Sequence, residues 1–258
     1  DMALSQLYET WDALSRSGTD LAWWQDFFIG FYRAFIEEDR WQQYLEGTGT
    51  TLVATALALL MGVILGVVVA VVRTAHDQQR PGRKKNPVLG AVNAIFRVYV
   101  TVIRGTPMML QLLIWAFVVF KSRQYTLVGI FGLGINSGAY VSEIIRGGLM
   151  AVDGGQMEAG RSLGMNRLAA TRFLVKRPAM KAVRPSVGNR LISLLKDTAR
   201  LSVIRGQELL YFAQAVATRT YNQVCPLIGA ACIYLVLVLI FTWLQGKLER
   251  RLRQSDRR

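Results

Sequence analysis

Long runs of apolar residues alternate with short polar segments along most of this chain. A helix rises 1.5 Å per residue, so about 20 apolar residues cross the hydrocarbon core of a bilayer. The pattern predicts an all-α integral membrane protein with five crossings. The predicted spans are Thr51–Val72, one crossing within Val88–Phe120, Thr126–Met150, Pro185–Ile204 and Val224–Gln245.

The second of these regions is longer than one crossing requires. It is interrupted by Arg104-Gly105-Thr106-Pro107, which is not a helical sequence because proline lacks the N–H donor that a helix interior needs. We therefore expect an interfacial approach followed by a span. In the first span, Gly62 and Gly66 lie four residues apart and predict a small-residue face for helix packing.

Aromatic residues recur at helical spacing before the first span, against an acidic background. They are Trp23, Trp24, Phe27, Phe28, Phe31, Tyr32 and Phe35. Because aromatic rings favour the headgroup zone, this pattern predicts an amphipathic helix at the outer membrane interface; partner binding is the alternative. We therefore divide the chain into an interfacial segment (1–48), a membrane domain (49–248) and a basic tail (249–258).

Basic residues give the chain a net charge of +14 and are unevenly distributed. They accumulate after the first span, between the third and fourth spans, and after the fifth. With five crossings all three groups lie on one side, which the positive-inside rule makes the cytoplasm, and the amino terminus lies outside. Nucleic-acid binding is the other explanation of this charge. The basic residues flank spans instead of interleaving with stacking aromatics, so no nucleic-acid partner is expected.

The polar segment between the third and fourth spans predicts a helix, a turn and a helix. Asp153 can cap the first turn, and Gln156, three residues later, can reach back to the capping residue. Gly164 fits the left-handed position that follows a helix. Asn166 can begin a second helix, which Pro178 is expected to stop.

This segment, at about 153–177, is too polar to enter lipid and is predicted to dock on another protein. Ala159, Gly160 and Gly164 carry little side chain, so a partner surface can approach the backbone closely. Glu158 is the acidic side chain expected to contact the partner.

Polar residues form a stripe along the fourth span. Asn189, Ser193 and Asp197 fall at i, i+4 and i+8, with Lys196 and Arg200 on the neighbouring face. A polar stripe at membrane depth is expected to face a bundle interior or a water-filled path. The alternative is that Lys196 and Asp197 are structural partners of other helices, with Arg200 completing a pair.

In the third span, Glu143 and Arg146 lie at i and i+3. They are expected chiefly to satisfy one another near the cytoplasmic end of their helix.

Several kinds of chemistry have no signature in this chain. It has no G-x-x-x-x-G-K-[ST] loop, so it is not expected to bind ATP itself. Cys225 and Cys232 lie seven residues apart in an apolar helix with no histidine nearby, which predicts neither a metal site nor a bridge. No nucleophile and base stand out together. We therefore expect no catalytic residue, metal or cofactor in this chain.

Four motifs, in order, resemble those of the membrane-spanning permease subunits of bacterial ABC importers for polar amino acids. Arg104–Pro107 looks like the RGTP element of that family, and Gly138–Gly148 like its GAY-x-x-E-I-x-R-G-G helix. Gly155–Gly160 looks like the start of the EAA loop, and Ser193–Thr198 matches a further family stretch. The resemblance covers the chain from about Leu45 onward.

The resemblance implies a five-helix type I importer fold in a bacterial cytoplasmic membrane, surrounded by lipid. It implies a second permease subunit, two ABC ATPase subunits that hold ATP and magnesium, and an extracytoplasmic solute-binding protein that delivers an amino acid. Transport by alternating access would follow. The residues assigned to ATPase coupling are Gln156, Glu158, Ala159, Gly160 and Gly164. Those assigned to the substrate pathway are Thr106, Pro107, Glu143, Asn189, Ser193, Lys196 and Asp197.

The chain departs from the family pattern at four positions. Gly160 replaces an alanine, which keeps the surface small but loosens the helix by about 1 kcal/mol. Arg177 stands in place of a leucine, and Arg200 and Arg205 where the family more often has an apolar residue and a glycine. The three arginines bear on substrate preference and on the limits of the fourth span.

Two other classes of function compete with this one. A passive channel or secondary carrier would use the polar stripe as its pore without an ATPase, although five spans without an internal repeat argue against a self-contained carrier. An enzyme acting on lipid would need a nucleophile or metal cluster that the sequence does not offer. Only the importer predicts a stoichiometric soluble ATPase at the cytoplasmic face.

Overall fold

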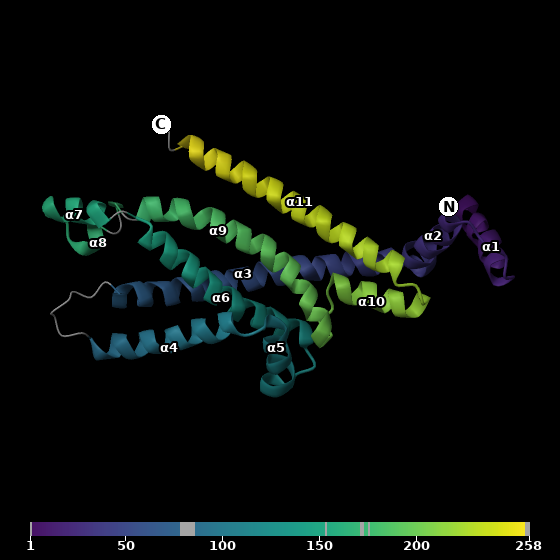
Figure 1. Cartoon of the computed structure of the whole chain (residues 1–258), viewed down its shortest axis with the longest axis horizontal. Helices are drawn as coiled ribbons and strands as arrows, with labels where there is room; N and C mark the ends of the chain where they lie inside the picture. Colours follow the sequence, from purple (N-terminus) through teal and green to yellow (C-terminus); the bar gives the residue numbers. More distant parts are fainter. Residues whose placement is uncertain (1, 78–85, 153, 171–172, 175, 256–258) are drawn as a thin grey trace.

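The computed structural model describes residues 2–77, 86–152, 154–170, 173–174 and 176–255. Throughout these ranges the regular structure is helical, with no strand. The long helices run roughly along the long axis of an elongated molecule (Figure 1). The described residues therefore agree with the predicted all-α class.

Within the described ranges, four helices are long and apolar enough to cross a membrane. They are α3 (Trp41–Asp77), α4 (Pro87–Gly105), α6 (Tyr125–Met150) and α11 (Val224–Ser255). They contain the first, third and fifth predicted spans, but α3 begins ten residues before Thr51. The predicted domain boundary between residues 48 and 49 thus falls inside one continuous helix.

The second predicted region differs from its expectation. Its first part, α4, is itself long enough to span, while the part after the break is a shorter apolar stretch of 108–120. That stretch comprises α5 (Met108–Leu113) and the π-helix η3 (Ile114–Phe120). By length and composition, α4 is thus the candidate crossing and 108–120 the shorter stretch, which is the reverse of the expected order.

The fourth predicted span is a polar helix that starts earlier than expected. Helix α9 (Lys176–Asp197) runs through Pro185 and continues as the 3-10 helix η5 (Thr198–Ile204). Pro178 was predicted to end a helix, but it lies in the first turn of α9. The missing N–H of proline is tolerated there, because first-turn amides have no partner within the helix.

The main apolar core lies where α3 packs against α6. A Cβ added at Gly62 would meet Ser137 Cβ at 2.6 Å, and one added at Gly66 would meet Val141 Cβ at 2.8 Å. The glycines therefore let the two backbones approach closely, which confirms the predicted small-residue face. Buried residues from α3, α5, η3, α6, α9 and η5 extend this core: Ala54, Ala58, Leu112, Ala116, Val128, Leu133, Leu194, Leu201 and Ile204.

A further helix, α10 (Leu209–Thr220), was not predicted. Its N-cap is Glu208, which is fully buried and accepts hydrogen bonds from the amides of Leu210 (2.9 Å) and Tyr211 (2.7 Å). Tyr234 of α11 donates its hydroxyl to the same carboxylate at 2.6 Å. Buried acceptors need such partners, so Glu208 fastens the start of α10 to α11.

The amino-terminal segment forms α1 (Met2–Arg16), α2 (Trp23–Phe31) and two short helices, η1 (Tyr32–Ile36) and η2 (Glu37–Asp39). Arg33 of η1 bonds Tyr8 at 3.2 Å and pairs with Asp12, both of α1. The hydrogen bond to Tyr8 raises the pKa of Arg33. The aromatic row is helical as predicted, and Trp23 is 81% exposed. Its place at a membrane interface remains a prediction.

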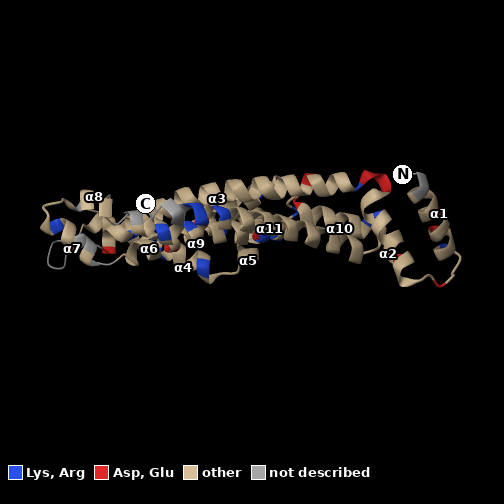
Figure 2. Ribbon diagram, turned by 90° about the horizontal axis from the view of Figure 1, so that it is seen from above, with Lys and Arg blue, Asp and Glu red and all other residues tan. Residues whose placement is uncertain are grey.

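The two ends of the molecule differ in character. Helices α1 and α2 lie at one end, and α7 (Gly154–Ser162) and α8 (Arg167–Ala170) lie at the other, where α11 also ends (Figure 1). Lys and Arg gather toward the α7 end, and most Asp and Glu lie toward α1 and α2 (Figure 2). The predicted outer segment and the predicted docking element are thus at opposite ends.

Candidate functional site

Helices α7 and α8 form a short hairpin between α6 and α9. Gly164 has φ +80°, as expected for the left-handed residue after a helix, and the amide of Met165 bonds the Gly160 carbonyl at 3.1 Å. Asn166 Oδ1 accepts a hydrogen bond from the Ala169 amide at 2.8 Å. The predicted turn and the predicted start of the second helix are therefore confirmed. Asp153 and the side chain of Gln156 lie outside the described residues.

The predicted coupling residues do not all share one surface. Glu158, Ala159 and Gly164 are exposed, but Gly160 is buried. A Cβ added at Gly160 would lie 2.5 Å from Leu174 Cδ1, so its small size serves packing inside the hairpin. The expectation that Gly160 offers open backbone to a partner was therefore wrong. Of the predicted coupling residues on α7, Glu158 and Ala159 are exposed and accessible to another protein, as are their neighbours Arg161 and Ser162.

The RGTP element forms the break between α4 and α5. Thr106 and Pro107 have extended backbone conformations there, and Thr106 Oγ1 donates to the Val102 carbonyl at 2.8 Å. The buried Gln111 donates Nε2 to Thr106 Oγ1 at 2.7 Å and to the Ile103 carbonyl at 2.7 Å. The Gln111 side chain thus satisfies the carbonyl that the helix break would leave open.

Gln111 also connects this break to α6 and α9. Asn136 Nδ2 donates to Gln111 Oε1 at 3.2 Å, and Arg190 Nη2 donates to Asn136 Oδ1 at 3.0 Å. The guanidinium of Arg190 lies 3.4 Å from Asp197 Oδ2 and its side chain is 9% exposed. A continuous polar network therefore runs from Thr106 to Asp197 through three helices.

Arg190 lies at the centre of this network, and the sequence interpretation missed it. The same face of α9 carries Arg190 and Asp197, two turns apart, so the i, i+7 spacing of opposite charges could have identified the pair. Arg190 also lies over the Tyr140 ring, 4.7 Å from its centroid. Arg104 lies over the same ring at 5.3 Å. Tyr140 thus joins the helix break to α9 by cation–π contacts.

The polar stripe of α9 is divided between different partners. Asp197 pairs with Arg190 and, at 2.6 Å, with Arg200, as the structural alternative expected for Arg200, but both partners lie on α9 or its continuation η5 and not on other helices. Asn189 instead accepts a hydrogen bond from Gln245 of α11 at 3.1 Å. Ser193 and Lys196 are exposed, and Ser193 donates only to its own helix, at the Asn189 carbonyl.

Glu143 is surrounded by three arginines. Arg146 Nη2 lies 3.0 Å from its carboxylate, as predicted, and Arg104 lies 3.7 Å away. Arg73 of α3 makes a third and closer ion pair. One carboxylate therefore holds together α3, α4 and α6, so its structural role is larger than the sequence indicated.

The His, Cys, Asp and Glu side chains are the possible metal ligands of this chain. In the ranges that the structure covers, no three His, Cys, Asp or Glu side chains come together in a way that could hold a metal ion. Cys225 is buried and Cys232 exposed, and both are free thiols.

Known proteins with similar sequences support one type of function. A family model described as "Binding-protein-dependent transport system inner membrane component" matches residues 88–254. The putative glutamine transport system permease protein GlnP of Rickettsia conorii is 31% identical over 212 residues, which cover 81% of this chain and 92% of that protein. The arginine transport system permease protein ArtQ of Bacillus subtilis is 40% identical over 163 residues, covering 61% and 74%.

A solved structure agrees with these relatives. It is titled "Crystal structure of an amino acid ABC transporter with histidines", and one of its chains aligns with a TM-score of 0.72 at 36% identity. The alignment covers 81% of this chain and 94% of that chain. The expected type I importer permease fold is therefore confirmed.

Proposed function

This chain belongs to the family of binding-protein-dependent transport system inner membrane components, and on that basis we propose how it works. It is the permease subunit of an amino-acid ABC importer. Two such subunits form the pathway, and two separate ATPase subunits bind ATP and magnesium. A solute-binding protein delivers the amino acid from outside. The amino terminus faces outward, and α7 and the carboxyl terminus face the cytoplasm.

The observation that carries this proposal is the position of α7. It is a polar helix that, together with α8, lies in the chain between α6 and α9, the two helices that carry Asn136, Arg190 and Asp197 of the polar network. A displacement applied to α7 by an ATPase is therefore transmitted directly to the polar residues of the bundle. This is the geometry that alternating access requires, since the network must open to one side at a time.

The polar network suits a zwitterionic solute. A carboxylate and an ammonium leave water only where fixed polar groups replace it. Thr106, Asn136 and Arg190 offer a hydroxyl, an amide and a guanidinium in one connected set. The carboxylates of Glu143 and Asp197 are already paired with arginines, so they are poorly suited to bind the ammonium group of a solute.

The relatives carry different amino acids according to their names, namely glutamine and arginine. Family membership therefore supports an amino acid as the transported substrate, but it does not identify which amino acid. The competing passive channel would need no ATPase. The two functions are distinguished by whether uptake requires ATP hydrolysis.

The test is uptake by the full complex reconstituted in vesicles, with and without ATP. The importer predicts accumulation against a gradient only with hydrolysable ATP and a stoichiometric ATPase subunit in the purified particle. Equilibration without ATP or without that subunit would support the channel instead.

The variant Glu158→Lys examines the coupling helix in the same assay. Glu158 is exposed on α7, so its reversal changes the docking surface without disturbing the fold. We expect ATP hydrolysis to become insensitive to substrate and uptake to fall roughly tenfold or more, because a like-charge contact at a docked surface costs several kcal/mol. The permease should remain folded. Unchanged uptake with substrate-stimulated hydrolysis would count against the assignment of α7.

A further inference from the structure

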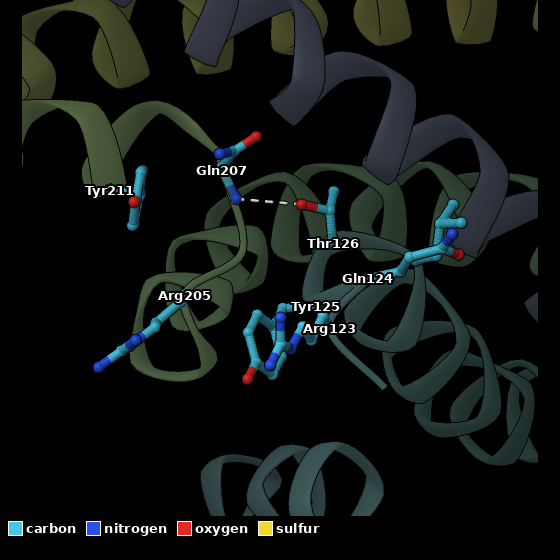
Figure 3. A pocket seen from close by; sticks show the side chains of 8 residues that line it. Arg123, Gln124, Tyr125, Thr126, Arg205, Gln207 and Tyr211 are labelled. Carbon is cyan, nitrogen blue, oxygen red and sulfur yellow. Dashed lines mark hydrogen bonds between the residues drawn. The ribbon is translucent and has the colours of Figure 1, made fainter. Parts of the chain in front are cut away.

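A pocket of about 370 Å³ lies where the chain enters α6 and where η5 ends (Figure 3). This volume falls within the usual range for small-ligand sites. The pocket is lined by Arg123, Gln124, Tyr125, Thr126, Leu127, Arg205, Gln207 and Tyr211. All eight of these residues are described, and none is acidic. The pocket thus combines two cationic groups, amides, hydroxyls and two aromatic rings.

The two arginines lie on opposite sides of this pocket. Figure 3 shows Arg205 on one side and Arg123 with Tyr125 on the other, beneath the hydrogen bond from the Gln207 amide to Thr126 Oγ1 at 3.1 Å. Both arginines are exposed, and no residue in the described ranges forms an ion pair with either. A guanidinium offers a rigid pair of donors that matches a carboxylate, so two unpaired guanidiniums make the pocket a site for an anionic group.

The backbone at Arg205 adds a second observation. Its φ is +61°, in the left-handed region, where side chains are disfavoured and glycine fits best. The amide of Arg205 is fixed in this turn by a hydrogen bond to the Ser202 carbonyl at 3.0 Å. Arginine is unfavourable in this backbone conformation, so its presence at position 205 points to a role for the side chain.

The pocket lies far from the coupling helix. It is at the start of α6, and α7 follows the end of that helix; 26 residues of α-helix extend about 39 Å. This length exceeds the roughly 30 Å hydrocarbon thickness of a bilayer. The pocket therefore lies at the membrane surface opposite α7, which is the outer surface in the proposed orientation.

Charge along the bundle favours the same kind of ligand. Glu143 faces three arginines, and Asp197 faces Arg190 and Arg200. These two carboxylates are outnumbered by the five arginines around them, so this part of the bundle carries a net positive charge. Such a field attracts carboxylates and opposes a cationic solute.

We propose that the Arg123–Arg205 pocket is a receiving site for the carboxylate group of the transported amino acid, and that the importer carries acidic or neutral amino acids in preference to cationic ones. This inference rests on the proposed function. The site acts after the solute-binding protein has released its cargo, so it contributes to turnover and not to docking.

The test uses Arg205→Gly and Arg123→Gln in the full complex, reconstituted in vesicles with its solute-binding protein at low ionic strength. Arg219→Gln is the matched control, because Arg219 is exposed on α10 and does not line the pocket. Uptake is measured with L-glutamate, L-glutamine and L-arginine. Thermal unfolding of each complex is measured in parallel, and glycine at 205 should not lower stability because it suits the left-handed backbone.

Each pocket variant is expected to lower the turnover of the preferred amino acid about tenfold at saturating binding protein, since a charge-assisted hydrogen bond to a carboxylate has about that effect on an equilibrium. The concentration of binding protein that gives half-maximal uptake should not change, and added salt should shrink the difference from wild type. Arg219→Gln should behave as wild type.

Three outcomes would overturn the inference. Unchanged turnover in both pocket variants would remove the receiving site. A shift in the half-maximal binding-protein concentration alone would make the arginines a docking contact for that protein. Preferred transport of L-arginine would contradict the substrate class. In all three cases the complex still transports an amino acid; a wild-type complex that transports none with ATP would instead remove the proposed function itself, and this inference with it.

Discussion

Asp197 has two arginine partners that differ in burial. The side chain of Arg190 is 9% exposed and also bonds Asn136, whereas that of Arg200 is 47% exposed and bonds Asp197 alone among the described residues. Removing a partner from a mostly buried pair leaves an uncompensated charge, while an exposed pair is screened by water. The two arginines therefore contribute differently to the same carboxylate.

This difference gives a direct comparison between Arg190→Gln and Arg200→Gln. We expect the first to destabilise the purified complex by about 3 kcal/mol and the second by less than about 1 kcal/mol. Thermal unfolding in detergent measures both. Adding Asp197→Asn to Arg190→Gln should restore part of the loss, because it removes the carboxylate that has lost its buried partner and keeps only the exposed one. Equal losses from the two arginine variants would contradict this account.

Glu143 provides a second comparison at the same scale. Its closest partner, Arg73, is 13% exposed, whereas Arg104 is 43% exposed and lies 3.7 Å away. A double-mutant cycle between Glu143→Gln and Arg73→Gln should give a coupling energy of about 1–3 kcal/mol in thermal unfolding. The cycle with Arg104→Gln should give less than about 0.5 kcal/mol. A larger coupling to Arg104 than to Arg73 would show that the ion pairs are ranked wrongly.

The packing of α3 on α6 depends on glycine at positions that face the other helix. A Cβ at Gly66 would meet the Ser142 amide nitrogen at 3.0 Å as well as Val141, and backbone atoms cannot move aside cheaply. Gly49, on the same helix, has open space around it. Position 66 thus has no room for a side chain, whereas position 49 of the same helix has room for one.

Gly66→Ala is therefore expected to destabilise the protein by about 1–3 kcal/mol, through overpacking between α3 and α6. Gly49→Ala should be neutral or stabilise it by up to about 1 kcal/mol, because alanine is the better helix former. Chemical or thermal unfolding in the same detergent compares them. A harmless Gly66→Ala would mean that the two helices do not pack as closely as described.

The elements differ in how far their sequences predict them. Helices α3, α6 and α11 follow from long apolar runs, and the α7–α8 turn follows from Gly164 and Asn166. Helix α10 was missed although its buried residues Leu209, Ala213, Val216 and Ala217 keep helical spacing, because twelve residues are too few for a span. The periodic spacing of these apolar residues would have indicated a helix. The prediction relied on the length of apolar runs, which finds membrane spans and overlooks short helices.

The candidate site was only partly predictable for a related reason. The spacing of Asn189, Ser193 and Asp197 along α9 identified polar residues correctly, but spacing along one helix does not show which neighbours they meet. Gln245 reaches Asn189 from α11 across 56 residues of sequence. Likewise, Arg73 reaches Glu143 across 70 residues. Contacts between distant helices depend on packing that a single sequence does not encode locally.

At the scale of the whole molecule, the α7–α8 hairpin and the polar network are connected through α6 and α9. Helix α6 ends next to α9, where a Cβ at Gly148 would lie 2.4 Å from Val183 Cγ2 and 3.2 Å from the Ala179 carbonyl. Such close packing leaves little freedom for the two helices to move independently. Movement of the α7–α8 hairpin, which lies between them in the chain, is thus expected to shift Asn136 on α6 and Arg190 on α9 together.

The most direct measurement places a photo-activatable cross-linking residue at position 158 in the complete, transporting complex. The account predicts a cross-link to the ATP-hydrolysing subunit, formed from the cytoplasmic side, together with retained ATP-dependent uptake before illumination and loss of uptake after it. Failure to cross-link to that subunit in an active complex, or labelling of residue 158 from outside the cell, would contradict the claim that α7 receives the force that drives transport.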